Sequence, residues 1–397
     1  MDHGDFPTSQ VEVKSIDATE LKDRIDDGED IAVLDVRVPD EYDQWAIDGP
    51  TVDVRNVPYF EFIDEVDEGL IDLPERSDSL VVVCAKGGAS EYVAGRLSAE
   101  LGVNAMNLAD GMNGWAAIYD RHKISRYEGP GAVYQYQRPS SGCLGYLVVS
   151  NGEAAVIDPL RAFTDRYVAD ANELGVDIKF ALDTHVHADH VSGVRALAEQ
   201  GADGVIPRAS AERGVTYADE MTLVDDGDVL PVGDARIEVI HTPGHTTDMT
   251  TYLIGDSLLA TGDGLFVESV ARPDLEAGDD GAADAARQLH ESLETRVLTF
   301  PEDTIIGGGH VSEAAEPAGD GTYTATLGQL RQEMEALSME QDSFVELVLS
   351  DMPPRPANHE EIVEANLGRR EVGDEEAFTL ELGPNNCAAS RDALASD

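Results

Sequence analysis

The chain has 397 residues, and its 79 Asp and Glu residues against 27 Lys and Arg residues give a formal net charge of −52 at pH 7. This length is more than one ordinary hydrophobic core accommodates, so we predict two domains. Acidic residues are spread along the whole sequence, which excludes nucleic acid as an expected partner and indicates adaptation to a salt-rich cytoplasm. The N-terminus lacks the basic and apolar regions of a signal peptide and no apolar run could span a bilayer, so we expect a cytoplasmic protein without a membrane partner.

The first segment, residues 11–122, alternates short apolar runs with helical patterns. Ile31–Val36 and Leu80–Val83 are predicted strands, and the second of them ends at Cys84. A glycine-containing loop follows, and a helical pattern then runs from about Glu91 to Leu101. Short buried strands that alternate with helices are typical of a parallel sheet, so we expect an α/β domain here.

Residues 123–130 are charged and end in Gly-Pro, which indicates a linker, and residues 131–350 follow with a different pattern. Asn151-Gly152 lies between two apolar runs and predicts a hairpin turn. Hairpins in both halves of this segment, with helices between them, favour an α+β layered domain. Residues 351–397 are predicted to form a C-terminal segment that becomes an acidic tail from about Gly373. The strands predicted within 131–350 are Leu144–Val149, Ala154–Ile157, Phe180–Leu182, Arg236–Ile240, Thr251–Ile254, Ser257–Ala260 and Thr304–Ile306.

A cluster of metal-ligating residue types follows the predicted strand at Phe180–Leu182. His185 and His187 should point the same way on an extended segment, because side chains alternate there with a period of two. Further imidazoles and carboxylates follow three later strands, beside glycines that let the backbone bend so that distant side chains converge. Because these are the usual ligands of zinc, iron and manganese, the sequence predicts a metal centre. Its seven candidate residues are His185, His187, Asp189, His190, His245, Asp263 and His310.

These motifs resemble the metallo-β-lactamase superfamily. The resemblance rests on His-Val-His-Ala-Asp-His at 185–190, Pro-Gly-His-Thr at 243–246, Thr-Gly-Asp at 261–263 and Gly-Gly-Gly-His at 307–310. It covers about residues 131–350 and implies an αββα sandwich with metal at one edge. The superfamily contains both hydrolases and oxygen-using enzymes, so the ligand set alone leaves the reaction open.

The sequence around these ligands is similar to that of persulfide dioxygenases (sulfur dioxygenases), of a haloarchaeal type. The similarity lies in residues 142–146, 261–267 and 271–275, and in a C-terminal segment that runs from Pro353 to Gly368. It implies one Fe(II) per chain, a low-molecular-weight thiol persulfide and O2 as substrates, and sulfite as the product. The implied iron ligands are His185, His245 and Asp263. The residues left to shape the pocket without a second metal are His187, Asp189, His190 and His310.

Two other functions stay open at this point. One is a hydroxyacylglutathione hydrolase-like thioesterase, in which both metal positions hold zinc and a bridging hydroxide attacks an acyl carbon. The other is a non-enzymatic, metal-stabilised protein that binds or senses sulfur.

In the dioxygenase hypothesis, Arg272 is a candidate to hold an anionic thiol substrate, because a guanidinium pairs with carboxylates in a bidentate way. A structural ion pair is the alternative for Arg272.

The first segment resembles a rhodanese (sulfurtransferase) domain over residues 11–122. The motifs are Leu34–Arg37, the loop from Cys84 to Ser90, and Leu108–Trp115. The resemblance implies that Cys84 carries a sulfane sulfur, stabilised by backbone N–H groups at the start of a helix. The loop residues that would bind the substrate are Lys86, Gly87 and Gly88.

Two positions depart from the rhodanese pattern. Ala89 stands where many members have Arg, and Trp45-Ala46 stands where a Gly-His pair is common. The alternative is therefore an inactive domain in which Cys84 is a buried thiol. Together the two domains predict sulfane-sulfur transfer from a donor beside persulfide oxidation, and the sequence leaves open whether the chain forms a homodimer.

Overall fold

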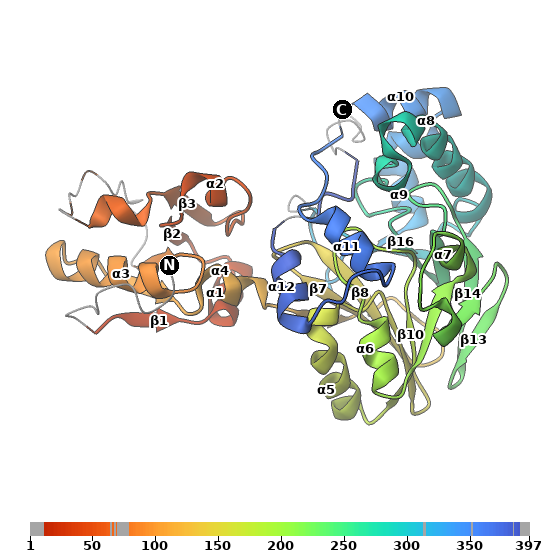
Figure 1. Ribbon diagram of the computed structural model, residues 1–397, viewed down its shortest axis with the longest axis horizontal. Helices are drawn as coiled ribbons and strands as arrows, with labels where there is room; N and C mark the ends of the chain where they lie inside the picture. The colour runs from red at the N-terminus through yellow and green to blue at the C-terminus, as the bar shows by residue number, and fades with distance from the viewer. Residues whose placement is uncertain are drawn as a thin grey trace. The chain divides into compact units, whose positions relative to one another are not determined.

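The computed structural model describes residues 12–63, 66, 69, 79–312, 315–350, 352–383 and 385–389. The chain divides into two compact units, one that ends at Ile118 and also takes in residues 138–140, and a larger one formed by residues 119–137 and from 141 onward (Figure 1). The segment predicted as a linker, 123–130, begins in a strand and lies within the larger unit.

The smaller unit is built on a parallel sheet with the strand order β1-β5-β4-β2-β3. Successive residues of β2 pack on opposite faces: Ala32 and Leu34 lie in one core cluster, and Ile31 and Val33 lie in the other. This alternation follows from the two-residue period of a strand and confirms the predicted α/β domain. The strands are β1 (Lys14–Ile16), β2 (Ile31–Asp35), β3 (Val52–Asn56), β4 (Leu80–Val83) and β5 (Ala105–Leu108), and the helices are α1 (Ala18–Asp26), α2 (Pro39–Tyr42), η1 (Tyr59–Phe62), α3 (Gly88–Glu100) and α4 (Gly111–Ala116).

The larger unit contains two mixed sheets that pack face to face. The first has the strand order β12-β11-β10-β9-β8-β7-β6, and the second has the order β13-β14-β15-β16-β17-β18. Their bounds are β6 (Asp120–Lys123), β7 (Ala132–Arg138), β8 (Cys143–Ser150), β9 (Glu153–Ile157), β10 (Asp177–Leu182), β11 (Asp203–Pro207), β12 (Thr222–Val224), β13 (Val229–Val232), β14 (Ala235–His241), β15 (Thr250–Ile254), β16 (Leu258–Gly262), β17 (Ile305–Gly308) and β18 (Ala325–Thr326).

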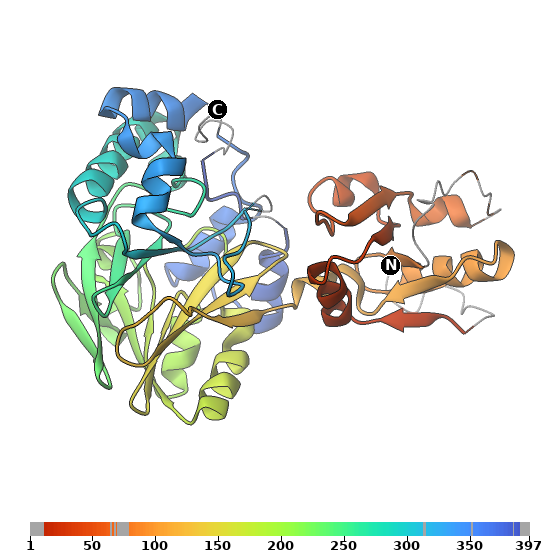
Figure 2. The ribbon, with the colours of Figure 1, turned by 180° about the vertical axis from the view of Figure 1, so that it is seen from behind.

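Apolar side chains from both sheets form the core between them, and helices cover the two outer faces (Figure 2). Val148 and Ile157 of the first sheet share one cluster with Ile237 and Leu258 of the second. This arrangement confirms the predicted αββα sandwich. The helices are η3 (Arg161–Phe163), α5 (Thr164–Leu174), α6 (Val194–Glu199), α7 (Arg208–Glu212), η4 (Ala218–Glu220), α8 (Asp274–Ser292), η5 (Leu293–Val297), α9 (Leu327–Glu333), η6 (Glu335–Ser338), α10 (Gln341–Ser350), α11 (His359–Asn366) and α12 (Asp374–Leu380).

The turn at Asn151-Gly152 has the geometry that its sequence predicts. The φ angles are 43° at Asn151 and 83° at Gly152, and positive values at both central residues define the type I′ turn of a two-residue hairpin. The turn joins β8 to β9, which pair antiparallel from Ser150 opposite Glu153.

The C-terminal segment folds against the larger unit instead of leaving it as a tail at Gly373. Ala377 and Leu380 of α12 share a core cluster with Ile362 of α11 and with Val191. Further on, Ala388 forms an antiparallel bridge with Ala271. The sequence did not predict this packing, because the few apolar residues lie in a segment of acidic composition. The part of the predicted tail beyond residue 389 lies outside the described residues.

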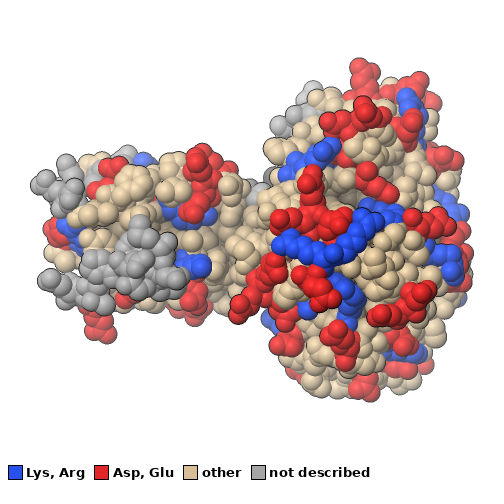
Figure 3. All heavy atoms as spheres, viewed as in Figure 1, with Lys and Arg blue, Asp and Glu red and all other residues tan. Residues whose placement is uncertain are grey.

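Acidic side chains cover much of the face of the larger unit seen in Figure 3, with basic side chains between them. Arginines of the larger unit pair with exposed acids: Arg370 contacts Glu361 and Glu376, and Arg161 contacts Asp374. Among the described residues, no helix is both long and apolar enough to cross a membrane.

Asp320 supplies a pH-dependent part of the stability. Burial alone would raise the pKa of this carboxyl, but hydrogen bonds from Thr322 and Ser125 outweigh it and lower the pKa from 3.8 to about 2. This stabilisation is present above about pH 4 and is lost as the pH falls towards 2. We expect Asp320→Asn to lower the free energy of unfolding by on the order of 1 kcal/mol near neutral pH, allowing for solvent screening.

Denaturant unfolding at several pH values measures this effect. The difference between wild type and Asp320→Asn should shrink below pH 4. A difference that stays constant from pH 6 to pH 2 would show that the carboxylate charge plays no part.

Candidate metal centre

The topology brings the seven candidate ligands to one edge of the sandwich. His185, His187, Asp189 and His190 lie in the loop between β10 and α6, while His245 follows β14, Asp263 follows β16 and His310 follows β17. Strands β14, β16 and β17 run in the same direction, because β14 and β16 are both antiparallel to β15 and β16 is parallel to β17. Their carboxyl ends therefore meet at the same edge, and all seven side chains are buried there.

Three of these residues form a triad whose ligand atoms have no partner in the protein. His185 Nε2 lies 3.8 Å and His245 Nε2 lies 3.5 Å from Asp263 Oδ2, and none of these three atoms has a hydrogen-bond partner. Each distance is longer than a hydrogen bond. Both are close to the separation of two ligands on one ion, about 3 to 3.6 Å for bonds of roughly 2.1 Å. The triad thus has the donor types and spacing of a cation site.

Both triad histidines are oriented through their other ring nitrogen. His245 Nδ1 lies 2.8 Å from the carbonyl oxygen of Arg272 and donates to it. His185 Nδ1 lies 2.9 Å from Thr184 Oγ1, and the Thr184 hydroxyl donates to Asp158 Oδ2 at 3.0 Å. These contacts place the proton on Nδ1 and leave the lone pair of Nε2 for a cation, which is the usual arrangement around a metal-bound imidazole.

Burial keeps the two triad imidazoles in the neutral form. It lowers the pKa of His185, and the neighbouring His187 lowers that pKa further. Burial also lowers the pKa of His245, despite the opposing effect of the Asp263 charge. Because a cation binds neutral imidazole and not imidazolium, no proton has to leave either ring before binding.

Two glycines make room for the triad carboxylate. An added Cβ at Gly309 would lie 2.6 Å from Asp263 Oδ1, and one at Gly262 would lie 2.4 Å from Met249 Cε and 2.7 Å from Thr184 Oγ1. Gly262 also has a φ angle of 48°, in the left-handed region that favours glycine. Gly309 is therefore required by close packing against Asp263, and Gly262 by its backbone conformation and its packing against Met249 and Thr184.

His187 does not face the triad as the alternation argument expected. Strand β10 ends at Leu182, so residues 183–190 are not an extended strand. The His187 ring lies beside that of His185, with centroids 4.2 Å apart, but its Nε2 contacts Asp158 Oδ1 at 3.1 Å. Asp158 also accepts the backbone N–H of Thr184 at 2.7 Å and so connects both histidines to the end of β9.

The remaining candidates form a second cluster with Cys143. His310 Nε2 lies 2.8 Å, His190 Nδ1 lies 3.1 Å and Cys143 Sγ lies 3.2 Å from one atom, Asp189 Oδ2. His310 Nδ1 also lies 2.7 Å from Asp263 Oδ1, so the second cluster adjoins the triad. Although burial opposes it, Asp189 raises the pKa of His190, and Asp263 and Asp189 raise that of His310.

Arg272 lies inside the protein with its guanidinium fully engaged. It is 2% exposed and makes a bidentate pair with Asp274, at 2.7 Å from Nε and 3.1 Å from Nη2. Its Nη1 donates to the carbonyl oxygens of Pro354 and Asn386. These contacts favour the structural ion pair over substrate binding, and they connect the C-terminal segment to the residue whose carbonyl holds His245.

Sequence reasoning missed the residues of the C-terminal segment that hold the histidine loop. The Asn366 side chain donates to the carbonyl oxygens of His187 and His190, at 3.0 and 2.8 Å. It also accepts the N–H of Ser192, and Glu381 accepts the N–H of Val191. No spacing in the sequence predicts these contacts, because they join positions more than 170 residues apart.

In the smaller unit, Cys84 lies at the end of β4 with its thiol inside the predicted loop. Cys84 Sγ accepts the backbone N–H of Gly87 and the hydroxyl of Ser90, both at 3.1 Å. Gly87 has a φ angle of 87°, and α3 begins at Gly88. Lys86 is exposed, and Ala89 is buried. The loop thus supplies two donors to sulfur but no fixed guanidinium.

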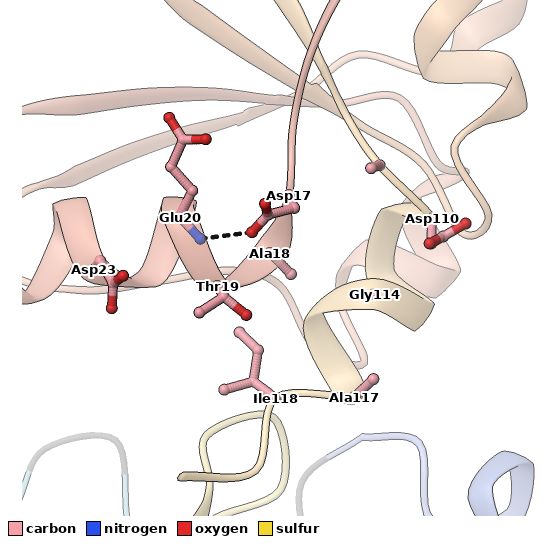
Figure 4. A pocket seen from close by; sticks show the side chains of 10 residues that line it. Asp17, Ala18, Thr19, Glu20, Asp23, Asp110, Gly114, Ala117 and Ile118 are labelled. Atoms are coloured by element: carbon pink, nitrogen blue, oxygen red, sulfur yellow. Dashed lines mark hydrogen bonds between the residues drawn. The ribbon is translucent and has the colours of Figure 1, made fainter.

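A hollow of about 550 Å³ also lies on the smaller unit, beside α1 and α4 (Figure 4). Its lining includes four acidic residues, Asp17, Glu20, Asp23 and Asp110, but not Cys84. These carboxylates would repel an anionic sulfur compound, so we do not assign the hollow to sulfur transfer.

Comparisons with known proteins agree with this architecture. The family model "Metallo-beta-lactamase superfamily" matches residues 140–310, and the model "Rhodanese-like domain" matches residues 17–118. The chain is 28% identical over 255 residues to the human mitochondrial persulfide dioxygenase ETHE1. The aligned residues make up 62% of this chain and 93% of that relative. It is 30% identical over 207 residues to a probable metallo-hydrolase of Burkholderia pseudomallei, over 42% of this chain and 68% of the relative.

A solved structure of ETHE1 from Myxococcus xanthus is also similar. Its TM-score is 0.51 at 28% identity, over 59% of this chain and 97% of that structure. The chain therefore belongs to the metallo-β-lactamase superfamily, with homologues among the persulfide dioxygenases, and carries a rhodanese-like domain before its metallo-β-lactamase domain.

Proposed function

We propose that the larger unit is a persulfide dioxygenase with one Fe(II) bound by His185, His245 and Asp263. The observation that carries the proposal is the triad itself, whose three facing ligand atoms are buried and have no partner in the protein. Two histidines and one carboxylate are the facial triad of non-haem iron oxygenases, which leaves coordination positions open. When bound, the iron supplies the activation of O2 and of the terminal persulfide sulfur.

The reaction balances with one molecule of water. One thiol persulfide, one O2 and one water give one free thiol, one sulfite and two protons, and the S–S bond breaks while the outer sulfur is oxidised. The protein contributes the orientation of its ligands through the Arg272 carbonyl and the Thr184 hydroxyl. Phe266 adds an apolar wall, because its ring meets His310 edge-on with centroids 5.9 Å apart.

The second cluster supports a single metal ion over the dinuclear zinc thioesterase. A second ion would need Asp189, His190 and His310 as ligands. The Cys143 thiol, 3.2 Å from Asp189 Oδ2, already lies beside the oxygen that His310 and His190 contact at 2.8 and 3.1 Å. Similarity to a probable metallo-hydrolase keeps hydrolysis as the alternative function, and the metal content separates the two.

We also propose that Cys84 accepts a sulfane sulfur. The Cys84 thiolate would attack the outer sulfur of a donor persulfide, form a persulfide on Cys84 and release the donor as a thiolate. The Gly87 N–H and the Ser90 hydroxyl point at the sulfur that carries the charge.

Oxygen uptake with a low-molecular-weight persulfide tests the main proposal. Asp263→Asn keeps the side-chain size but removes the anionic ligand, so we expect at least a 100-fold loss of uptake together with loss of bound iron. Asp256 is an exposed aspartate just before β16, at the other end of the strand, and serves as the control. Asp256→Asn should keep both the oxygen uptake and the bound iron. Full activity of an iron-free or zinc-loaded Asp263→Asn protein would exclude the proposal.

Thr184 is expected to tune metal affinity without contacting the metal. Thr184→Val keeps the shape of the side chain but removes the hydroxyl that meets His185 Nδ1. We predict that iron binds about 10- to 100-fold more weakly, as is typical when such a supporting contact is lost. Thr184→Ser keeps the hydroxyl and should bind iron as wild type does; equal affinities for the valine and serine variants would contradict the role.

Mass spectrometry of the protein and of its proteolytic peptides tests the proposal for Cys84. After incubation with a persulfide donor, the wild-type protein should gain the mass of one sulfur atom on the peptide that contains Cys84, and Cys84→Ser should not. Cys387→Ser serves as the control for loss of a buried thiol elsewhere. Absence of the adduct with every donor tried would refute sulfur transfer and leave the dioxygenase proposal standing.

A further inference from the structure

Cys143 belongs to a buried cluster beside the triad that the proposed reaction does not use. We define the Cys143 cluster as Cys143, Asp189, His190 and His310, whose exposed fractions are between 1% and 5%. Each residue offers a ligand atom, and these atoms lie within 4.8 Å of one another. A carboxylate, two imidazoles and a thiol are together a donor set that zinc accepts. The positions of the atoms in the Cys143 cluster therefore decide whether a cation can bind there.

The Cys143 cluster is gathered around one oxygen atom, Asp189 Oδ2, although Asp189 Oδ1, His190 Nε2 and His310 Nδ1 have no hydrogen-bond partner in the protein. Asp189 Oδ2 has three protein neighbours, at 2.8 Å from His310, 3.1 Å from His190 and 3.2 Å from the Cys143 thiol. The triad atoms stand 3.5 and 3.8 Å apart instead and have no partner. A cation bound to Asp189 Oδ2 would take His310 and His190 as further ligands and would have to displace the Cys143 thiol, whose sulfur atom lies 3.2 Å from this oxygen.

The backbone fixes the position of Cys143. Cys143 forms an antiparallel bridge with His310, in which the Leu144 N–H donates to Gly309 at 2.8 Å and the Val311 N–H donates to Gly142 at 2.9 Å. The chains approach so closely that a Cβ at Gly142 would lie 2.2 Å from the Val311 carbonyl oxygen. The thiol is thus held beside His310 by main-chain contacts and is 1% exposed.

We propose that Cys143 sets the number of metal ions in the centre. Its thiol occupies the space and one hydrogen-bonding direction of Asp189 Oδ2 that a second cation would need, so only the triad binds an ion. This inference rests on the proposed single-ion centre. Removal of the sulfur atom leaves Asp189, His190 and His310 around a vacated volume that is large enough for a bound ion. Cys143 is in this account a specificity-determining residue for metal number and not a ligand.

The test measures the binding of Co(II) and of Zn(II) to full-length, metal-depleted protein at high salt. Equilibrium dialysis with elemental analysis gives the number of ions, and the visible spectrum of Co(II) reports their coordination independently of activity. We expect about one ion per chain in wild type and about two in Cys143→Ala. Cys143→Ser keeps a hydroxyl donor to Asp189 and should bind about one ion.

Cys387→Ala is the matched control, because Cys387 is also a buried thiol beside His310 and Asp189 but hydrogen-bonds to the Asn385 carbonyl oxygen. It should bind about one ion. If wild type and Cys143→Ala each bind one ion, the inference is overturned. Two ions in wild type and one in Cys143→Ala would make Cys143 a ligand, and would overturn both the inference and the single-ion centre. If Cys143→Ala fails to fold by circular dichroism, Cys143→Gly carries the same expectation.

Discussion

The structure depends on buried ligand atoms that the protein leaves without partners. His185, His245 and Asp263 each direct a polar atom at a common point where no hydrogen-bond donor or acceptor of the protein satisfies it. An unsatisfied buried polar group costs about 1–3 kcal/mol, and more if it is charged. A cation bound there, as proposed, would remove this cost, so that metal binding would also stabilise the larger unit.

The contacts around the triad distribute this constraint over the whole larger unit. Asp158 at the end of β9 holds Thr184 and His187, and Thr184 in turn orients His185. The C-terminal segment closes the other side, where Asn366 and Glu381 bind the backbone of the histidine loop. These contacts hold the backbone of the loop that carries His185, while the Thr184 hydroxyl and the Arg272 carbonyl orient the two imidazole rings of the triad.

Much of the fold and of the site could be predicted from the sequence, because local patterns carry them. The strand Leu80–Val83 and the Asn151-Gly152 turn have the predicted positions, since strand burial and positive φ angles are properties of short segments. The orientation of His187 could not be predicted, because the strand ends before it and Asp158 turns the ring. The contacts of Arg272 with Pro354 and of Asn366 with His187 were also hidden, because these partners are distant in sequence and are backbone carbonyl groups.

X-ray diffraction at the iron absorption edge, on crystals of the protein loaded anaerobically with Fe(II), tests the central claim most directly. The account predicts one anomalous peak per chain, bounded by His185 Nε2, His245 Nε2 and a carboxylate oxygen of Asp263. A peak among Asp189, His190 and His310, with or without one at the triad, would contradict it.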